Sequence, residues 1–376
     1  MMKVIIAYAS AGAGHLKAAE AINNCFKQKY PEAEVKLVDI LEKSTPLFKY
    51  SYIWFYTFMV RHAFFLWGLL FALSERGPLR IIVRKLSSFS HAVNTRSFAE
   101  FLRKEDPDAV ISTHFAPPEI AAHLKKNGQI RSKLITVITD FGVHPFWLCK
   151  DTDLYIGASE FTKKQLMREG VAEDKIKICG IPVDAKFLKS HDREGLCKTI
   201  GIDKDIFTAL IMTGSFGIGP IEEIVEALCK DVQLLVVCAN NKRLSEKLNQ
   251  RKLPQVKAFG FVNNAEELMA VSDCIITKPG GLSTSETLVM ELAPIFISAI
   301  PGQEMGNVRA LASCGIGVKL EDVSKIKKAV LEYRDFPEKL LEVKERIRRI
   351  RKPFAAEEIC DVVRESCSGA CGQRPV

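Results

Sequence analysis

Short apolar runs alternate with longer amphipathic stretches along almost the whole chain. An apolar run bounded by polar turns predicts a buried strand. A stretch with apolar residues every three or four positions predicts a helix. Regular alternation of the two favours parallel sheets covered by helices on both faces. We therefore expect an α/β protein.

The alternation forms two series that meet near Gly180-Ile181-Pro182-Val183. The first series has predicted strands at 4–9, 35–39, 109–112, 134–139 and 153–157, with helices at 18–29, 118–126 and 162–169. The second has predicted strands at 207–212, 234–238, 256–259, 274–277 and 295–298, with helices at 222–230, 244–252, 265–271, 283–292 and 305–313. We expect two tandem Rossmann-like, doubly wound domains, at 1–180 and 184–350, with a cleft between them, then a helix and tail at 351–376. Ligands in such folds bind outside the carboxyl ends of the strands.

One aromatic segment, at about 46–86, is too long and too apolar for a strand–helix loop. Its stretch 53–73 has the length to span a bilayer, but Arg61 and His62 interrupt it where charge is costly. Aromatic residues beside Arg and Lys are typical of a helix in the membrane interface. The alternative is a buried helical insertion on the first domain. The predicted membrane contacts are Trp54, Phe55, Phe64 and Trp67.

Composition adds little beyond this pattern. The 53 Lys and Arg exceed the 45 Asp and Glu, giving a net charge of +8. This excess suits an anionic ligand or an anionic membrane surface, and equally an ordinary basic surface. No stretch indicates a nucleic-acid module. Most of the eleven Cys lie in apolar runs, which favours a reducing compartment, and no metal site or signal peptide is expected.

The predicted first strand leads into a glycine-rich turn, Ser10 to His15. Gly12 and Gly14 let backbone amides approach a ligand, and His15 in the first turn of a helix can accept a proton from an attacking hydroxyl. Asp140 and His144 follow another strand end and could orient an acceptor or each other. His114 ends a further strand, where a structural role is expected. His15 could instead only cap or pack.

Three polar turns follow strands of the second domain. Residues 213–217 and 277–286 place glycines and hydroxyls before a helix, which suits a diphosphate. In the second turn Lys278 could add charge, and Glu286 could accept bonds from two ribose hydroxyls. Residues 301–307 offer amides and a carboxylate to a sugar. Ser283 with Glu286 could also be an ordinary capping box, but recurrence at successive strand ends weakens that interpretation.

With these turns, residues 3–320 resemble the monogalactosyldiacylglycerol synthase and processive diacylglycerol glucosyltransferase family, part of glycosyltransferase family 28. The peptidoglycan N-acetylglucosaminyltransferase belongs to the same inverting group. The resemblance implies a GT-B fold, a UDP-sugar bound to the C-terminal domain, a lipid acceptor bound to the N-terminal domain, and no cofactor or metal. It also implies a peripheral enzyme on the cytoplasmic face of the membrane.

The resemblance also implies roles for single residues. His15 corresponds to the acceptor-loop histidine, as base or acceptor-orienting group, with Asp140 and His144 as alternatives. The implied donor-site residues are Gly214, Ser215, Val262, Lys278, Gly280, Gly281, Leu282, Ser283, Glu286, Gln303, Glu304 and Asn307. Ala11 and Ala13 depart from the family's richer glycine run, and Gly280-Gly281 replaces a common Gly-Pro-Gly. These departures bear on donor choice more than on fold.

The expected reaction is transfer of a hexose from a UDP-sugar to a membrane lipid, most simply diacylglycerol, with inversion at the anomeric carbon. Three alternatives stay open. One is a UDP-N-acetylglucosamine-dependent transferase acting on another lipid or a small acceptor. Another is a nucleotide-sugar epimerase, since the non-hydrolysing epimerases share the architecture. The last is a nucleotide-sugar sensor without turnover.

Overall fold

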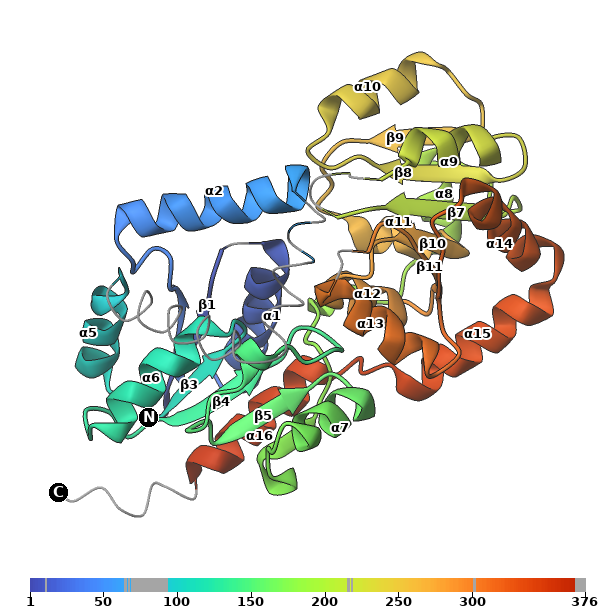
Figure 1. Cartoon of the computed structure of the whole chain (residues 1–376). Helices are drawn as coiled ribbons and strands as arrows, with labels where there is room; N and C mark the ends of the chain where they lie inside the picture. The colour runs from blue at the N-terminus through green and yellow to red at the C-terminus, as the bar shows by residue number, and fades with distance from the viewer. Residues whose placement is uncertain are drawn as a thin grey trace. The chain divides into compact units, whose positions relative to one another are not determined.

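The chain folds into two compact units in the computed structural model, which describes residues 1–10, 12–63, 66, 68, 94–214, 217, 219–299 and 302–368 (Figure 1). The side chains of Tyr56, Val60, Arg61, His62 and Gln303 lie outside that description. The first unit comprises 1–184, 300–306 and 354–376, and the second comprises 185–299 and 307–353.

A six-stranded parallel sheet forms the centre of the first unit, in the order β2-β1-β3-β4-β5-β6. Its strands are β1 (Lys3–Tyr8), β2 (Glu34–Asp39), β3 (Ala109–Ser112), β4 (Lys133–Val137), β5 (Leu154–Gly157) and β6 (Ile176–Ile178). In the register, Ile6 of β1 pairs with Leu37 of β2 on one side and Ile111 of β3 on the other. The carboxyl ends of these three strands therefore meet at one edge.

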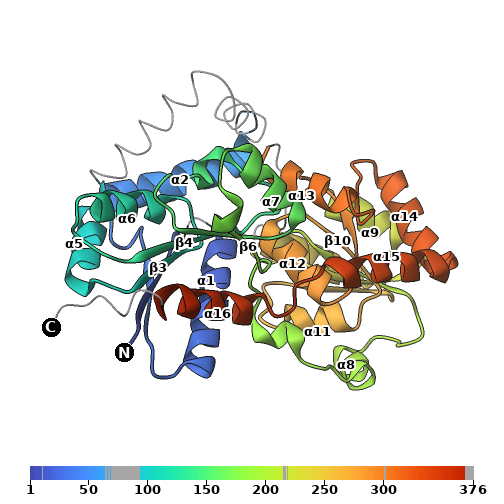
Figure 2. The same cartoon turned by 90° about the horizontal axis from the view of Figure 1, so that it is seen from below.

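Successive residues of β1 enter two different cores. Val4 and Ile6 pack with α1 (Ala13–Lys29) and α16 (Ala355–Ser368), which lie side by side in Figure 2. Ile5 and Ala7 pack on the opposite face with α5 (Arg96–Glu105) and α6 (Ala116–Lys126). Side chains alternate across a strand, so a strand apolar at every position is covered on both faces.

Further helical segments of the first unit are described as well. The helix α2 (Pro46–His62) packs Phe48, Tyr52 and Ile53 against the α5/α6 core. Farther along the chain, η1 (Pro145–Trp147) and α7 (Glu160–Arg168) cover the end of the sheet near β5, where Trp147, Tyr155 and Leu166 share a small core. A short turn, η2 (Glu173–Lys175), precedes β6.

The second unit has a parallel sheet of the same size, in the order β12-β11-β10-β7-β8-β9. Its strands are β7 (Thr208–Met212), β8 (Gln233–Val237), β9 (Val256–Phe259), β10 (Cys274–Thr277), β11 (Ala293–Phe296) and β12 (Val318–Lys319). Its helical elements are η3 (Ala185–Leu188), α8 (Arg193–Ile200), α9 (Ile221–Leu228), α10 (Lys242–Gln250), α11 (Ala265–Ala270), α12 (Gly281–Val289), α13 (Gln303–Ala312), α14 (Val323–Asp335) and α15 (Pro337–Ile350). The helix α13 begins in the first unit and ends in the second.

The apolar core of the second unit lies between its sheet and the helices α9, α10 and α14. Ile211 and Val236 of the sheet meet Ile224, Leu244 and Ile326 of these helices, and all five side chains are buried. This packing fixes the sheet, so that the turns after β7, β10 and β11 start from rigid strands.

Candidate active site

His15 lies in the first turn of α1, directly after the carboxyl end of β1. The helix begins at Ala13, with Gly12 as its N-cap residue. The predicted helix began only at Ala18, because the sequence from Ser10 to His15 lacks apolar periodicity. The earlier start places His15 inside the helix, with its ring directed by helical geometry toward the ends of β3 and β4.

Two threonines hold the His15 ring. Its Nδ1 lies 2.6 Å from the carbonyl oxygen of Thr113 and 3.0 Å from Oγ1 of Thr139. The Thr113 hydroxyl also donates to the His15 carbonyl, at 2.9 Å. Thr113 follows β3 and Thr139 follows β4, so three strand ends fix one imidazole. The sequence analysis did not identify either threonine as a partner.

These contacts decide which ring nitrogen carries the proton. A carbonyl oxygen can only accept, so Nδ1 carries a hydrogen and donates it to Thr113. In the neutral ring, Nε2 then keeps its lone pair. Burial lowers the pKa of His15, and the bond to the Thr113 carbonyl only partly opposes that shift. The ring is therefore neutral at physiological pH, in the tautomer that can take up a proton at Nε2.

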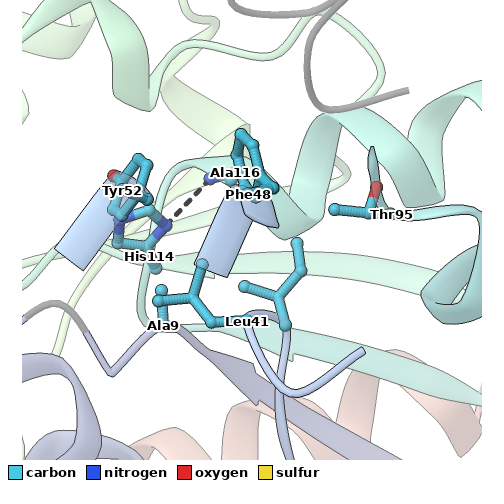
Figure 3. Close-up of a pocket in the computed structure, with 8 residues that line it drawn as sticks. Ala9, Leu41, Phe48, Tyr52, Thr95, His114 and Ala116 are labelled. Atoms are coloured by element: carbon cyan, nitrogen blue, oxygen red, sulfur yellow. Dashed lines mark hydrogen bonds between the residues drawn. The ribbon is translucent and has the colours of Figure 1, made fainter. Parts of the chain in front are cut away.

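Aromatic rings surround this imidazole. The His114 ring meets it edge-on at 4.9 Å between centroids, and the Trp147 ring lies 6.1 Å away. His114 has a structural role as well, since its Nδ1 accepts a hydrogen bond from the N–H of Ala116, the first residue of α6, at 3.2 Å (Figure 3). The low-polarity surroundings account for the lowered pKa.

Asp140 and His144 are both buried beyond the end of β4. His144 is the N-cap residue of η1, because its Nδ1 accepts from the Phe146 N–H at 3.2 Å, and its ring contacts the Phe146 ring. The side chain of His144, the predicted alternative base, thus already stabilises the turn η1 through its Nδ1. Its catalytic role, and that of Asp140, stays a prediction.

In the second unit, α12 starts directly after the end of β10 and its turn. Its N-cap residue is Gly280, which has no side chain to occupy the first amides of the helix. The capping-box interpretation of Ser283 is wrong, because α12 already begins at Gly281 and Ser283 lies within its first turn. Free amides at a helix N-terminus attract an anion.

The remaining donor residues of this turn lie around the same helix. Lys278 and Glu286 are half-buried, and Leu282 is buried. Asn307 of α13 is fully buried, and its Nδ2 donates to the Pro279 carbonyl at 2.8 Å. Asn307 thus supports the turn before α12 through its side-chain amide nitrogen.

Two buried hydroxyls near these turns lack a partner within the described part of the chain. They are Oγ1 of Thr213, after β7, and Oγ1 of Thr284, in the first turn of α12. Next to Thr213, Gly214 is exposed and has a φ of 79°, a conformation that favours glycine. An unpartnered buried hydroxyl costs free energy, so such groups often mark a ligand site. Neither threonine was predicted from the sequence.

For some predicted donor-site residues the structure gives only their burial, and others lie outside the described residues. Val262 is half-buried after β9, and its neighbour Phe261, which the sequence analysis passed over, is 67% exposed. Glu304 of α13 is buried. Ser215 and the Gln303 side chain lie outside the described residues. No cluster of His, Cys, Asp and Glu suited to a metal ion occurs among the described residues.

The helix α2 carries an exposed apolar face on the side away from the core. Trp54 is 65%, Phe55 47% and Phe58 42% exposed, and the Trp54 and Phe58 rings stack 5.2 Å apart. Leu47 and Tyr50 extend this face toward the start of the helix. Phe64, Trp67 and the basic residues Arg76, Arg80, Arg84 and Lys85 lie outside the described residues. No helix in the described ranges is long and apolar enough to cross a membrane.

Comparisons with known proteins match the chain along nearly its full length. Residues 15–183 match the family description "Monogalactosyldiacylglycerol (MGDG) synthase", and residues 208–359 match "Glycosyltransferase family 28 C-terminal domain". A protein of Bacillus cereus named processive diacylglycerol beta-glucosyltransferase is 31% identical over 96% of this chain and 93% of its own length. The chain belongs to glycosyltransferase family 28. The enzyme of the same name from Bacillus thuringiensis is 30% identical over the same shares of both chains.

Several solved structures share the fold of this chain at low sequence identity. The structure of Acinetobacter baumannii MurG has a TM-score of 0.62 at 14% identity, covering 97% of this chain and all of the other. The UDP-GlcNAc 2-epimerase from Neisseria meningitidis, bound to UDP-GlcNAc, gives the same values. HepE from Anabaena in complex with UDP-glucose has a TM-score of 0.55 at 14% identity over 98% of this chain and all of the other. This family 28 glycosyltransferase therefore has the expected GT-B fold.

Proposed function

We propose that this protein transfers glucose from UDP-glucose to the free hydroxyl of diacylglycerol, forming a β-glucosyl lipid at a membrane surface. The observation that carries the proposal is the 31% identity, over 96% of the chain, to a relative named processive diacylglycerol beta-glucosyltransferase. The geometry of His15 and the exposed face of α2 support it independently, because one suits a hydroxyl nucleophile and the other suits a lipid surface.

On the acceptor side, the lipid hydroxyl is the nucleophile and His15 is the base. The oxygen attacks the anomeric carbon, the bond from that carbon to the UDP oxygen breaks, and the hydroxyl proton passes to Nε2 of His15. The Thr113 carbonyl then stabilises the imidazolium through the hydrogen bond at Nδ1. Single displacement inverts the anomeric carbon, so an α-linked donor gives a β-linked product.

On the donor side, the diphosphate is the leaving group and needs an anion site. Gly281, Leu282 and Ser283 form the first turn of α12, so their amides lie at the positive end of the helix dipole. The Thr213 and Thr284 hydroxyls can donate to phosphate oxygens, which would supply the partners they lack among the described residues. Lys278 adds positive charge, and Glu286 accepts from the ribose hydroxyls.

At the membrane, the exposed face of α2 carries the enzyme to its acceptor. Trp54, Phe55 and Phe58 supply aromatic surface of the kind that partitions into the bilayer interface. The opposite face of the same helix packs on the first unit through Phe48 and Tyr52. The helix therefore has an apolar partner on its inner side and an apolar, solvent-exposed outer side, which supports peripheral attachment to a membrane. We propose that the surface it binds is the cytoplasmic face of the membrane and that it carries anionic lipid.

A donor panel tests the proposal. Purified protein is incubated with diacylglycerol in mixed micelles and with radiolabelled UDP-glucose, UDP-galactose or UDP-N-acetylglucosamine. We expect label in a glycolipid from UDP-glucose, with a β-anomeric signal by NMR. Successive bands with one, two or more sugars would show that this protein, like its relatives by name, is processive.

Other outcomes of the donor panel would indicate one of the alternative functions. Conversion of UDP-N-acetylglucosamine to its C2 epimer without acceptor would make the protein an epimerase. Label in a lipid other than diacylglycerol, or in a soluble acceptor, would replace the proposed acceptor. Tight UDP binding with no turnover on any acceptor would indicate a sensor.

A further inference from the structure

Within the first unit, two glycines allow the backbone of a loop to lie directly on the start of a helix. Gly142 belongs to the loop after β4, between Asp140 and His144, and Gly306 belongs to the first turn of α13. A Cβ atom at Gly142 would lie 2.7 Å from the Gly306 Cα, and a Cβ atom at Gly306 would lie 2.9 Å from the Gly142 Cα. Carbon atoms that are not bonded to each other pack at about 3.5–4.0 Å. Each position therefore excludes any larger residue unless the two backbones move apart.

Space, and not backbone conformation, requires glycine at both positions. Neither residue has a φ in the left-handed region that favours glycine, whereas Gly302, just before α13, does, at 83°. Alanine would fit both local conformations, so its cost would come from its methyl group meeting the opposite backbone. Relief of that contact requires the two backbones to separate by about 1 Å, the difference between 2.7 Å and an ordinary carbon–carbon distance.

The loop is restrained by α7 on both sides of Gly142. Oγ1 of Thr162, a fully buried side chain, donates to the Phe141 carbonyl at 2.8 Å. The Val143 N–H donates to Oε1 of Gln165 at 2.7 Å. Both partners belong to α7, so the backbone before and after Gly142 is tied to one helix. A methyl group at position 142 would therefore displace the start of α13 more readily than the loop.

The first turn of α13 carries the buried carboxylate of Glu304. Glu304 and Gly306 belong to the same helical turn, so a displacement of Gly306 displaces Glu304 as well. A carboxylate accepts hydrogen bonds, which suits the hydroxyls of a sugar, and Glu304 is one of the residues expected at the donor site. The contact between the two glycines therefore controls where this expected sugar-binding group lies.

We infer that Gly142 and Gly306 are positioning residues for the transfer reaction. Their contact fixes the distance between the loop after β4 and the first turn of α13, and thereby holds the Glu304 carboxylate where a hydroxyl of the donor hexose can donate to it. The inference rests on the proposed function and deepens it, because it makes selection of the hexose depend on two residues that act only through Glu304. A misplacement of about 1 Å can lower an enzymatic rate about 100-fold.

The test compares two donors that differ only in the direction of one hydroxyl, UDP-glucose and UDP-galactose, with the same diacylglycerol in mixed micelles. Gly142→Ala and Gly306→Ala should each lower kcat/KM for UDP-glucose by about 100-fold. Each should also reduce the ratio of kcat/KM for UDP-glucose to that for UDP-galactose. A variant that only loses folded protein would lose both rates equally, so this donor ratio is the decisive quantity. UDP affinity by calorimetric titration should stay near wild type, because the turn that begins α12 is unchanged.

A further variant shows whether the glycines act through Glu304. Glu304→Gln keeps the size of the side chain but removes its charge, and it should reduce the same donor ratio. Adding Gly142→Ala to Glu304→Gln should change the ratio little further, because both substitutions affect one interaction. Gly195→Ala is the control, since a Cβ atom there is also crowded, but by the exposed side chain of Asp192, which can turn away. This control should retain the wild-type rate and donor ratio.

An unchanged donor ratio in both glycine variants would overturn the positioning role, whatever their melting temperatures. A full additional loss in the double variant would contradict action through Glu304 and overturn it too. Equal use of the two donors by the wild type would have the same consequence, since no selection would then depend on the contact. Wild-type transfer from UDP-glucose in any of these results would leave the proposed function standing. Absence of transfer to diacylglycerol by the wild type would instead overturn the proposed function, and the positioning role with it.

Discussion

At the scale of single residues, His15 owes its proposed chemistry to one hydrogen-bond acceptor. The Thr113 carbonyl requires a proton at Nδ1, and burial keeps the ring neutral, so Nε2 is left as the basic atom. The two effects have different origins: the tautomer is set by backbone geometry at the end of β3, and the pKa by the apolar rings around the site. A substitution can therefore alter one without the other.

Replacing His15 by alanine should lower kcat by roughly 10²–10⁴, the range for loss of a general base. UDP affinity, measured by calorimetric titration, should be nearly unchanged. His123→Ala is the control, because His123 is an exposed histidine of α6. A loss of less than tenfold in the His15 variant would make that residue structural and pass the role to Asp140 and His144.

The lowered pKa of His15 predicts the acid side of the pH profile. A base works only when deprotonated, so activity should fall as pH drops through the folded-state pKa. Because burial places that pKa below the ordinary value of 6.5, the acid limb of kcat should lie below pH 6.5. Initial rates in saturating donor and acceptor across pH 5 to 8 measure it. An acid limb above pH 6.5 would contradict the assignment of His15 as the titrating base.

On the donor side, Glu286→Ala should weaken UDP binding by about 10- to 150-fold, corresponding to roughly 1.5–3 kcal/mol for a charged hydrogen bond. We choose Glu286 because its carboxylate is half-buried and belongs to α12, the helix that begins at Gly281. Calorimetric titration with UDP measures the change. Glu246→Ala, an exposed carboxylate of α10 in the same unit, should bind UDP as the wild type does. Equal affinities in the two variants would remove Glu286 from the site.

At the scale of elements, α2 combines two surfaces that usually belong to different helices. Its inner residues contribute to the first core, and its outer aromatic residues Trp54, Phe55 and Phe58 are exposed. An exposed aromatic face of this kind is costly in water and favourable at a bilayer. The proposed membrane contact can therefore be removed without changing residues of the core.

Changing Trp54, Phe55 and Phe58 together to serine should abolish sedimentation with anionic vesicles and activity on lipid, because the interfacial apolar surface is lost. UDP affinity and melting temperature should stay near wild type, since all three side chains are exposed. Phe336→Ser removes an exposed aromatic residue elsewhere and is the control. If the triple variant still sediments as the wild type does, the face is not the membrane contact.

Sequence patterns located the elements well where the signal was local. The predicted strands at 109–112, 256–259 and 274–277 coincide with β3, β9 and β10, because unbroken apolar runs mark buried parallel strands. The very short β6 and β12 were missed, since two or three residues carry no periodicity. The starts of α1 and α12 were placed too late, because glycines open both helices and give no apolar signal.

The candidate site could be predicted only in part for a related reason. His15, Glu286 and the glycine turns are visible as residue types in a local context. The partners of His15 are not, because Thr113 and Thr139 are separated from it by 98 and 124 positions and come together only through the strand order.

At the scale of the whole molecule, the chain folds into two units, and each includes residues from late in the sequence. Ile359 of α16 is fully buried in the first unit, and Ile347 of α15 is fully buried in the second. These two isoleucines are close in sequence but are buried in different units, so a substitution at each one tests the stability of a different unit.

Replacing each isoleucine by alanine should lower the stability of one unit by about 2–5 kcal/mol, the usual range for such a truncation. Hydrogen exchange followed by mass spectrometry separates the two. Ile359→Ala should reduce protection in β1 and β3, and Ile347→Ala in the second sheet. A uniform loss of protection over both sheets in either variant would show that the units unfold as one.

The position of α16 at the end of the chain also determines when the first unit can complete its fold during synthesis. The β1 face formed by Val4 and Ile6 is completed by Ile359 and Val363, which leave the ribosome only after the whole second unit. At about 5–20 residues per second, the nascent first unit waits roughly 10–35 s with that face covered by α1 but not yet by α16. The half of the enzyme that is synthesised first thus receives its last core residues after the other half has been made, and during that interval it presents some of the apolar surface that chaperones bind.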